Sequence, residues 1–196
     1  MIKNKLLRYV AAWIISAAVC LGTLGSTVVY AAEVSDSAAY CISEEDIETC
    51  KSAPCNVNPK AISEKKTYEY ASALNSNGSK QKDLQRNEDT TSNEYGLRVH
   101  NGRYCIAVGT KYADTVGEKL NIVLSNGNII PCIVGDVKAE RDTDSTESYC
   151  VHDGSVVEFI VDKHIFKKVC DNSGTVNFVP GFDGKIEKIV PDSDSN

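Results

Sequence analysis

Two apolar runs joined by an Asn-Gly dipeptide constrain the fold of this chain more than any other feature. Residues 120–124 and 129–134 are strand-like, and Asn126 and Gly127 lie between them. An Asn-Gly pair between two apolar runs is the strongest short-range signal of a β-hairpin. The sequence therefore predicts β structure in the C-terminal half of the chain.

The region 95–190 has the composition of a small, mainly β domain. Its candidate strands are short, rich in Val and Ile, and bounded by Asn-Gly or Asp-Gly pairs that favour turns. The six candidate strands cover residues 103–108, 118–124, 128–134, 155–161, 175–179 and 185–190. One short helix is expected at 163–170, with Asp162 as its N-cap. This set of elements predicts a small closed barrel.

The segments on either side of this domain are more polar. Residues 32–74 are expected to form a small, partly helical, Cys-containing segment, with one helix opening at Ser43 and a second over 63–74. Residues 75–94 contain a single large apolar side chain, which predicts a flexible linker. Residues 191–196 are polar and are expected to form a disordered tail.

The first 31 residues predict export from the cell. Three basic residues precede the uncharged stretch 9–29, and Val29-Tyr30-Ala31 offers small or β-branched residues before a cleavage site. This is the pattern of a secretory signal peptide. The alternative is a retained membrane anchor, because the uncharged stretch is long enough to span a bilayer. We therefore expect a secreted protein, or one anchored in the membrane at its N-terminus.

Charge excludes several classes of partner. The whole chain carries a net charge of −6, and loss of the three basic residues in segment 1–31 makes the mature chain more acidic, near −9. Such a chain is not suited to bind nucleic acid or anionic lipid. It also has no Gly-rich phosphate loop, no Ser nucleophile elbow and no basic-aromatic patch, so we expect no cofactor.

Cysteine usage fits an oxidising compartment. Seven cysteines remain after the signal segment: Cys41, Cys50, Cys55, Cys105, Cys132, Cys150 and Cys170. No Cys-x-x-Cys pair occurs, and no His lies near the closest pair, so disulfides are expected rather than a metal site. A natural partition places three in the N-terminal half and four in the C-terminal half. Because seven is odd, one thiol stays free or forms a disulfide-linked dimer.

Four segments in order carry a resemblance to a known family. They are Ile106-Ala-Val-Gly-Thr, Val116-Gly-Glu-Lys-Leu-Asn-Ile, Ile133-Val-Gly-Asp and Asp153-Gly-Ser-Val-Val-Glu-Phe. The series, within residues 95–190, resembles the three-aspartate (3D) domain, as found in secreted or phage-associated Firmicutes proteins. That family is a six-stranded double-psi β-barrel related to the catalytic barrel of membrane-bound lytic transglycosylases. The resemblance implies this fold and cleavage of peptidoglycan glycan strands.

The chain departs from the family pattern at its three aspartates. The first falls on Gly109 and is missing, the second falls on Asp136, and the third falls on Glu158. An insertion, residues 140–149, separates the last two acids, and Lys138 stands where the family has glycine. The resemblance therefore implies the fold more firmly than the activity.

Asp136 and Glu158 are the candidate catalytic residues. Glycosidic bond cleavage needs a carboxyl group of raised pKa to protonate the leaving oxygen, and one acid/base carboxylate suffices where the sugar's own hydroxyl attacks. By strand alternation the Asp136 side chain is expected on the same face as Cys132 and Val134. Asp136 is the expected acid/base, with Glu158 assisting. Glu158 either shares a desolvated face with Ile160 or lies on the solvent face while its neighbours face the core.

Lys138 and His152 are the expected substrate-binding residues. His152 precedes a turn and either points into the same cleft as Asp136 or lies on the surface. Acids at 142–147 have calcium-like spacing but lack the turn glycine and the distal Glu of a calcium loop, so a solvated acidic loop is expected and no metal site. Cys150 is interpreted as a half-cystine rather than a nucleophile.

These features support three functions. The first is an exported peptidoglycan lytic transglycosylase that uses Asp136. The second is a non-catalytic barrel that binds a cell-wall glycan or a protein and has lost its chemistry with the first family aspartate, at Gly109. The third is a structural role in which the odd cysteine links two chains.

Overall fold

The structure is a computed structural model of the chain, and it describes residues 55–74 and 79–192. The expected signal segment, 1–31, and the expected helix opening at Ser43 lie outside the described residues, as does most of the Cys-containing segment. Within the described ranges, no helix has both the length and the apolar character needed to cross a membrane.

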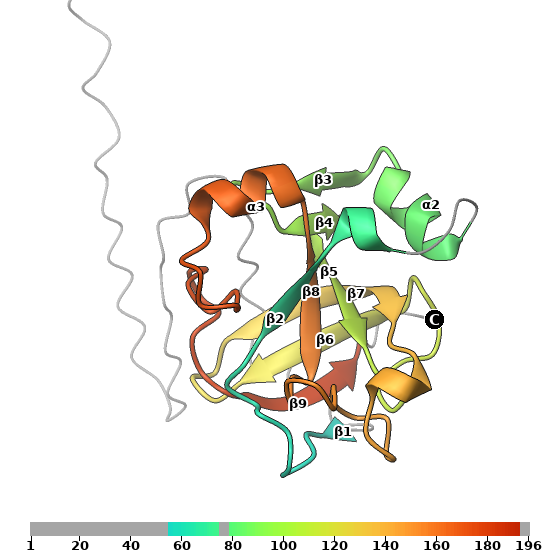
Figure 1. Cartoon of the computed structure of the whole chain (residues 1–196), viewed down its shortest axis with the longest axis vertical. Helices are drawn as coiled ribbons and strands as arrows, with labels where there is room; N and C mark the ends of the chain where they lie inside the picture. Colours follow the sequence, from blue (N-terminus) through green and yellow to red (C-terminus); the bar gives the residue numbers. More distant parts are fainter. Residues whose placement is uncertain (1–54, 75–78, 193–196) are drawn as a thin grey trace, which may run out of the picture. The chain divides into compact units, whose positions relative to one another are not determined.

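The described chain is mainly β, with nine strands in one mixed sheet (Figure 1). The strands are β1 (Cys55–Asn56), β2 (Thr67–Tyr70), β3 (Thr90–Ser92), β4 (Arg98–His100), β5 (Arg103–Val108), β6 (Lys119–Leu124), β7 (Ile129–Val137), β8 (Val157–Val161) and β9 (Ile186–Pro191). The helices are α2 (Lys80–Arg86) and α3 (Lys163–Val169), with 3-10 turns η2 (Ala71–Ala73) and η3 (Glu140–Asp142). The strand order is β1-β9-β6-β7-β5-β4-β3, and β8 pairs with both β5 and β2.

The predicted hairpin is confirmed as β6 and β7, which pair antiparallel. The Leu124 amide donates to the Asn128 carbonyl at 2.9 Å, so residues 125–127 form the loop. Gly127 takes a φ of +88°, the left-handed position that a three-residue hairpin loop reserves for glycine. The Asn126 side chain donates to the Asp183 carbonyl at 2.8 Å and ties the loop to the segment before β9.

Strand alternation builds the main core. In β6, Leu120, Ile122 and Leu124 are buried, and they join Val157, Phe159 and Val161 of β8 in one apolar cluster. Figure 1 shows β2 and β8 crossing in front of β6, so these two parts of the sheet face each other across that cluster. The period-two pattern of the sequence therefore sets which face of each strand is inside.

A second, smaller apolar cluster covers the opposite face of the sheet. Cys105, Ile133 and Ile160 come from three neighbouring strands, and Leu74 and Leu84 pack against them from the segments around η2 and α2. The N-terminal part of the described chain thus lies over the outer face of β5, β7 and β8. This cover matters because the candidate acids lie on the same outer face.

Five of the six expected strands are present, at 103–108, 118–124, 128–134, 155–161 and 185–190, each within a few residues of its predicted bounds. The expected helix is confirmed as α3, with the Asp162 carboxylate accepting from the His164 amide at 2.8 Å and the Ile165 amide at 3.0 Å. The sixth expected strand, 175–179, is wrong. That segment forms turns, and its Val176 amide donates to the Lys66 carbonyl at 2.8 Å.

Three expectations outside the sheet core need correction. The helix predicted over 63–74 is wrong, because Thr67–Tyr70 is strand β2, parallel to β8. The linker predicted over 75–94 is wrong for residues 79–94, which include α2 and β3; the Ser79 hydroxyl caps α2. The tail predicted from residue 191 is wrong at its start, because Pro191 ends β9 and Asp192 is buried beside Arg103.

The four cysteines whose side chains the structure describes, Cys105, Cys132, Cys150 and Cys170, are free thiols, so the disulfides expected among them are not present. For one pair the reason is the sheet itself. Cys132 lies in the main core, whereas Cys105 lies in the small cluster on the opposite face. The backbone of β5 and β7 separates the two thiols.

Candidate active site

The two candidate acids lie in one row across three strands. Ala107 of β5 is the Cα partner of Asp136 on β7 and also of Glu158 on β8. Residues paired across a sheet project from the same face, and two strand spacings put their Cα atoms roughly 10 Å apart. Asp136 and Glu158 therefore flank the small side chain of Ala107 on the outer face of the sheet.

A bulge places Asp136 on this face. Val134 pairs with Ile106, but the next pair is Ala107 with Asp136, so Gly135 is skipped. The expectation that Asp136 shares the parity of Cys132 and Val134 is therefore wrong, because a bulge reverses the alternation beyond it. Gly135 has no room for a side chain: a Cβ there would lie 2.4 Å from Ile160 Cδ1.

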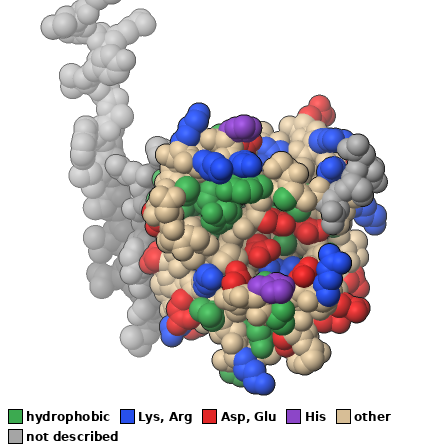
Figure 2. All heavy atoms as spheres, in the orientation of Figure 1, with side chains coloured by type: hydrophobic (Ala, Val, Ile, Leu, Met, Phe, Trp, Pro, Cys, Tyr) green, Lys and Arg blue, Asp and Glu red, His purple; other side chains and the backbone are tan. Residues whose placement is uncertain are grey.

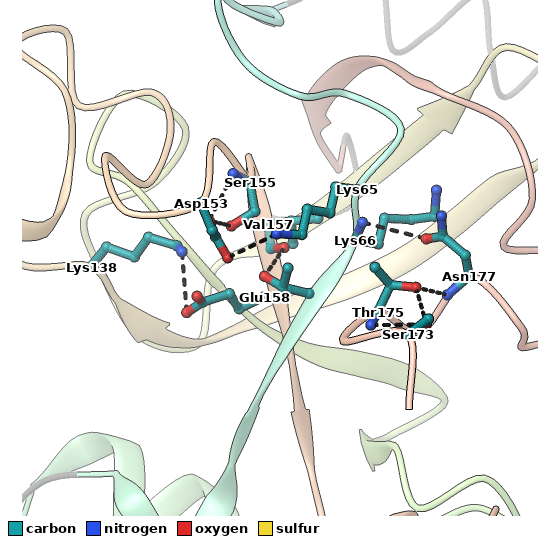
Figure 3. Close-up of polar contacts among 11 residues, drawn as sticks. Lys65, Lys66, Lys138, Asp153, Ser155, Val157, Glu158, Ser173, Thr175 and Asn177 are labelled. Atoms are coloured by element: carbon teal, nitrogen blue, oxygen red, sulfur yellow. Dashed lines mark hydrogen bonds and ion pairs between the residues drawn. The ribbon is translucent and has the colours of Figure 1, made fainter. Parts of the chain in front are cut away.

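Glu158 forms an ion pair with the expected substrate-binding residue Lys138. The distance from Lys138 Nζ to Glu158 Oε2 is 3.1 Å, and the two side chains are 6% and 22% exposed. Figure 3 shows the Lys138 amine directed at the Glu158 carboxylate, with Asp153 beside them. Val157, Phe159 and Val161 fill the main core, so Glu158 and Ile160 share the outer face. The ammonium group of Lys138 thus neutralises one acid of the row.

A third acid, Glu69, belongs to the same group. It lies on β2, whose Thr67 pairs with Glu158 and whose Glu69 pairs with Ile160. Burial raises the pKa of Glu69 to about 8, with further upward contributions from the charges of Asp136 and Glu158, and Lys138 opposes them. The sequence analysis did not identify this residue.

Asp136 has a more polar environment than Glu69. Burial raises its pKa, but the Gln81 side-chain amide donates to Asp136 Oδ1 at 3.1 Å and favours the ionised form. The backbone N–H of Val137 and the charge of Lys138 act in the same direction. Gln81 comes from α2, so part of the expected linker holds the carboxylate in place.

We call Glu69, Asp136, Glu158 and Lys138 the acid cluster. Three carboxyl groups and one ammonium group meet here on strands β2, β7 and β8 and on the segment after β7. Figure 2 shows acidic side chains gathered near the middle of the face that it presents, interspersed with basic ones. The cluster is half-buried, so its carboxyl groups are desolvated and yet can be reached from solvent.

His152, the second expected substrate-binding residue, does not join the acid cluster. Its side chain is 71% exposed, and Nε2 lies 3.7 Å from Asp142 Oδ1 on the acidic loop. The imidazole is therefore a surface group beside that loop.

Cys150, Asp153 and Glu158 form a small group with ligand-type atoms within 4.8 Å of one another. Such a group could hold a cation. However, Lys138 pairs with Glu158 at 3.1 Å, and Lys65 lies 3.8 Å from Asp153. The Asp153 carboxylate also accepts from the amide and the hydroxyl of Ser155. Both carboxylates are thus compensated by the chain's own groups.

The acidic loop is folded by its own carboxylate. Asp144 accepts hydrogen bonds from the backbone amides of Ser148 at 2.7 Å and Tyr149 at 3.1 Å. Burial opposes ionisation here, but the hydrogen bonds from Thr146 and these amides together outweigh it and hold the pKa of Asp144 well below its usual value. The calcium-like spacing of the sequence therefore reflects a turn that is closed by internal hydrogen bonds.

Gly109 and the loop of residues 140–149 lie in close contact. Gly109 follows β5, and a Cβ at this position would lie 1.9 Å from the carbonyl oxygen of Glu147. Glu147 belongs to the insertion 140–149, and its oxygen also accepts from the Lys111 amide at 3.4 Å. The insertion thus occupies the space that an aspartate side chain at position 109 would need.

Two residues of the site escaped the sequence analysis for an identifiable reason. Glu69 lies in Thr-Tyr-Glu-Tyr, where the strand-forming Thr and Tyr residues fall within the predicted helix 63–74. Their β propensity could have revealed the strand. Gln81 offered no comparable signal, because its role depends on where α2 packs.

Comparisons of the chain with protein-family models, with curated proteins and with solved structures find no match.

Proposed function

We propose that this chain is an exported, cell-wall-associated lytic transglycosylase that cleaves peptidoglycan glycan strands, with Asp136 as acid/base and Glu158 assisting. The single observation that supports this most is the row Asp136–Ala107–Glu158, because it brings two partly desolvated carboxyl groups to one accessible face. Glycosidic bond cleavage requires a carboxyl group of raised pKa, and burial raises the pKa of Asp136. Export is supported by the basic and apolar start of the sequence.

We further propose that the six long strands form a double-psi barrel. Two parallel pairs, β2 with β8 and β5 with β7, support this fold. Suppose that β2 is exchanged with β7, β5 with β8, and β6 with β9. The parallel pair β2–β8 then becomes the parallel pair β5–β7. The exchange also leaves the β5–β8 and β6–β9 pairs unchanged. Such internal two-fold symmetry is what two interlocked, equivalent motifs would produce.

The same exchange converts the β6–β7 pair into a contact between β2 and β9. A backbone hydrogen bond favours this closure: the Ile186 amide, at the start of β9, donates to the Ser63 carbonyl at 2.9 Å. Ser63 precedes β2 by four residues. Closure here would complete the barrel by joining the start of β9 to the segment before β2.

The proposed activity is tested with purified sacculi. We expect Asp136→Asn to abolish the release of soluble anhydro-muropeptides and to leave thermal unfolding nearly unchanged, because asparagine can keep the Gln81 hydrogen bond. Asp171→Asn is the matched control, because Asp171 is exposed and only caps the turn at Ser173. Equal release by the wild type and Asp136→Asn would discard the catalytic assignment.

A second function, binding of a glycan without cleavage, is favoured by the blocked position Gly109 and by the ion pair that occupies Glu158. Retention of the protein on sacculi without release of anhydro-muropeptides would support this alternative. In that case Asp136→Asn would weaken retention rather than abolish a reaction.

A further inference from the structure

We propose that Glu69 is the proton donor of the acid cluster and that Asp136 is its base. This inference rests on the function proposed above and deepens it. Sequence reasoning and the family resemblance both pointed to a single acid/base carboxylate. The structure adds a second carboxyl group with a different environment.

The first argument is position. Glu69 and Thr67 project from the same face of β2, and Thr67 pairs with Glu158. Glu69 therefore belongs to the outer face that carries Asp136 and Glu158. Its neighbour in β8 is the apolar Ile160. Beneath the three acids lie the buried side chains of Ile160 and Ala107, so the acids rest on an apolar floor.

The second argument is hydrogen bonding. Glu69 Oε1 is buried, and no donor among the described residues reaches it. A buried carboxylate without donors is costly, whereas a neutral carboxylic acid is tolerated and carries a proton to give away. Asp136 differs in this respect, because Gln81 donates to it at 3.1 Å. Hydrogen bonding thus favours the neutral form of Glu69 and the ionised form of Asp136.

The third argument is charge. The ionisable groups that act on Glu69 are Asp136 from β7, Glu158 from β8 and Lys138 from the segment that follows β7. Two of these are acids, and the ammonium group of Lys138 is engaged with Glu158 at 3.1 Å. Burial and the two acids raise the pKa of Glu69 to about 8, and Lys138 only partly opposes them. Where the environments of two titratable groups push their pKa values apart, the group with the higher pKa acts as the acid and the other acts as the base.

The reaction step balances without a further reactant. Glu69 gives its proton to the glycosidic oxygen, and the bond between that oxygen and the anomeric carbon breaks with its electron pair on the oxygen. A hydroxyl oxygen of the same sugar bonds to the anomeric carbon, and its proton passes to the Asp136 carboxylate. The products are an anhydro-sugar end and a free hydroxyl end. Proton exchange with solvent restores both acids.

The test compares the full-length wild type with Glu69→Gln, Asp136→Asn and the control Glu187→Gln on purified sacculi from pH 5 to pH 9. Glu187 is an exposed acid of β9 outside the acid cluster. Its replacement makes the same Glu-to-Gln change without altering the site. We expect Glu69→Gln to lower the rate about 100-fold or more, as loss of a general acid does. Wild-type activity should fall as the pH rises through about 8, where Glu69 loses its proton.

Carboxyl carbon-13 NMR gives a readout independent of activity. The signal assigned to Glu69, by its loss in Glu69→Gln, should titrate near pH 8. Titration of this signal below pH 5 would overturn the inference even if Glu69→Gln were inactive. A Glu69→Gln rate within three-fold of the wild type, with Asp136→Asn inactive, would overturn it and leave the proposed function standing. Absence of release by the wild type at every pH would overturn both.

Discussion

Replacement of Glu69 by glutamine should stabilise the protein, and the gain should grow with pH. Burial raises the pKa of this carboxyl group from 4.5 to about 8, so the folded state keeps a proton that the unfolded state gives up. The favourable contribution of this proton is fully present below pH 4.5 and is lost as the pH rises to about 8. Glutamine resembles the neutral acid in shape and has no charge to gain on unfolding.

The magnitude follows from the two pKa values. One pKa unit corresponds to about 1.4 kcal/mol, so ionisation of Glu69 favours the unfolded state by about 3 kcal/mol at pH 7 and by about 1 kcal/mol at pH 5. Glu69→Gln removes this penalty. The difference in free energy of unfolding between the variant and the wild type should therefore widen by about 2 kcal/mol between these two pH values.

Urea denaturation followed by circular dichroism at pH 4.5, 5.5, 6.5 and 7.5 measures this difference. Glu187→Gln is the control, and because Glu187 is exposed its stability curve should run parallel to that of the wild type. A constant difference between Glu69→Gln and the wild type across this range would refute the reasoning. It would mean that Glu69 ionises in the folded protein much as it does in the unfolded chain.

Three further changes test other parts of the structure. Asp192→Asn removes the charged partner of Arg103, and breaking such a mostly buried pair should cost about 3 kcal/mol in urea denaturation; a cost below about 0.5 kcal/mol would show that residue 192 is not part of the fold. Gly109→Ala places a methyl group against the Glu147 carbonyl and should cost at least about 2 kcal/mol, whereas unchanged stability would contradict the placement of the inserted loop. Burial lowers the pKa of Lys66 to about 8, so the free energy of unfolding of the wild type minus that of Lys66→Met should increase by up to about 3 kcal/mol from pH 8 to 10.5; a difference that stays constant over this range would contradict it.

In the candidate site, local sequence patterns identify two of the acids, whereas long-range packing determines how they are arranged. Asp136 and Glu158 were identified from the sequence because each follows or interrupts a conspicuous apolar strand. Their common face was not predictable, since the bulge at Gly135 reverses the parity of Asp136 and depends on pairing with β5. Glu69 could not be placed without knowing that β8 accepts β2 as a parallel neighbour.

The inserted loop gives a second example. From the sequence, the glycine at position 109 and the insertion 140–149 are two separate departures from a family pattern. In the structure the two positions are linked, because the backbone of the loop takes the space that a side chain at position 109 would need. Sequence spacing cannot reveal such a contact between residues 109 and 147, because no local rule links them.

The sequence by itself determined the features that depend on neighbouring residues. These are the hairpin around Gly127, the alternating strands of β5 to β9 and the cap of α3 at Asp162, all of which rest on backbone preferences and short-range hydrogen bonds. Tertiary structure alone decided the pairing of β2 with β8, the bulge at Gly135 and the meeting of three acids with Lys138. The reason is physical: the burial and the charges that set the chemistry of those acids come from residues distant in the chain, and only packing brings them together.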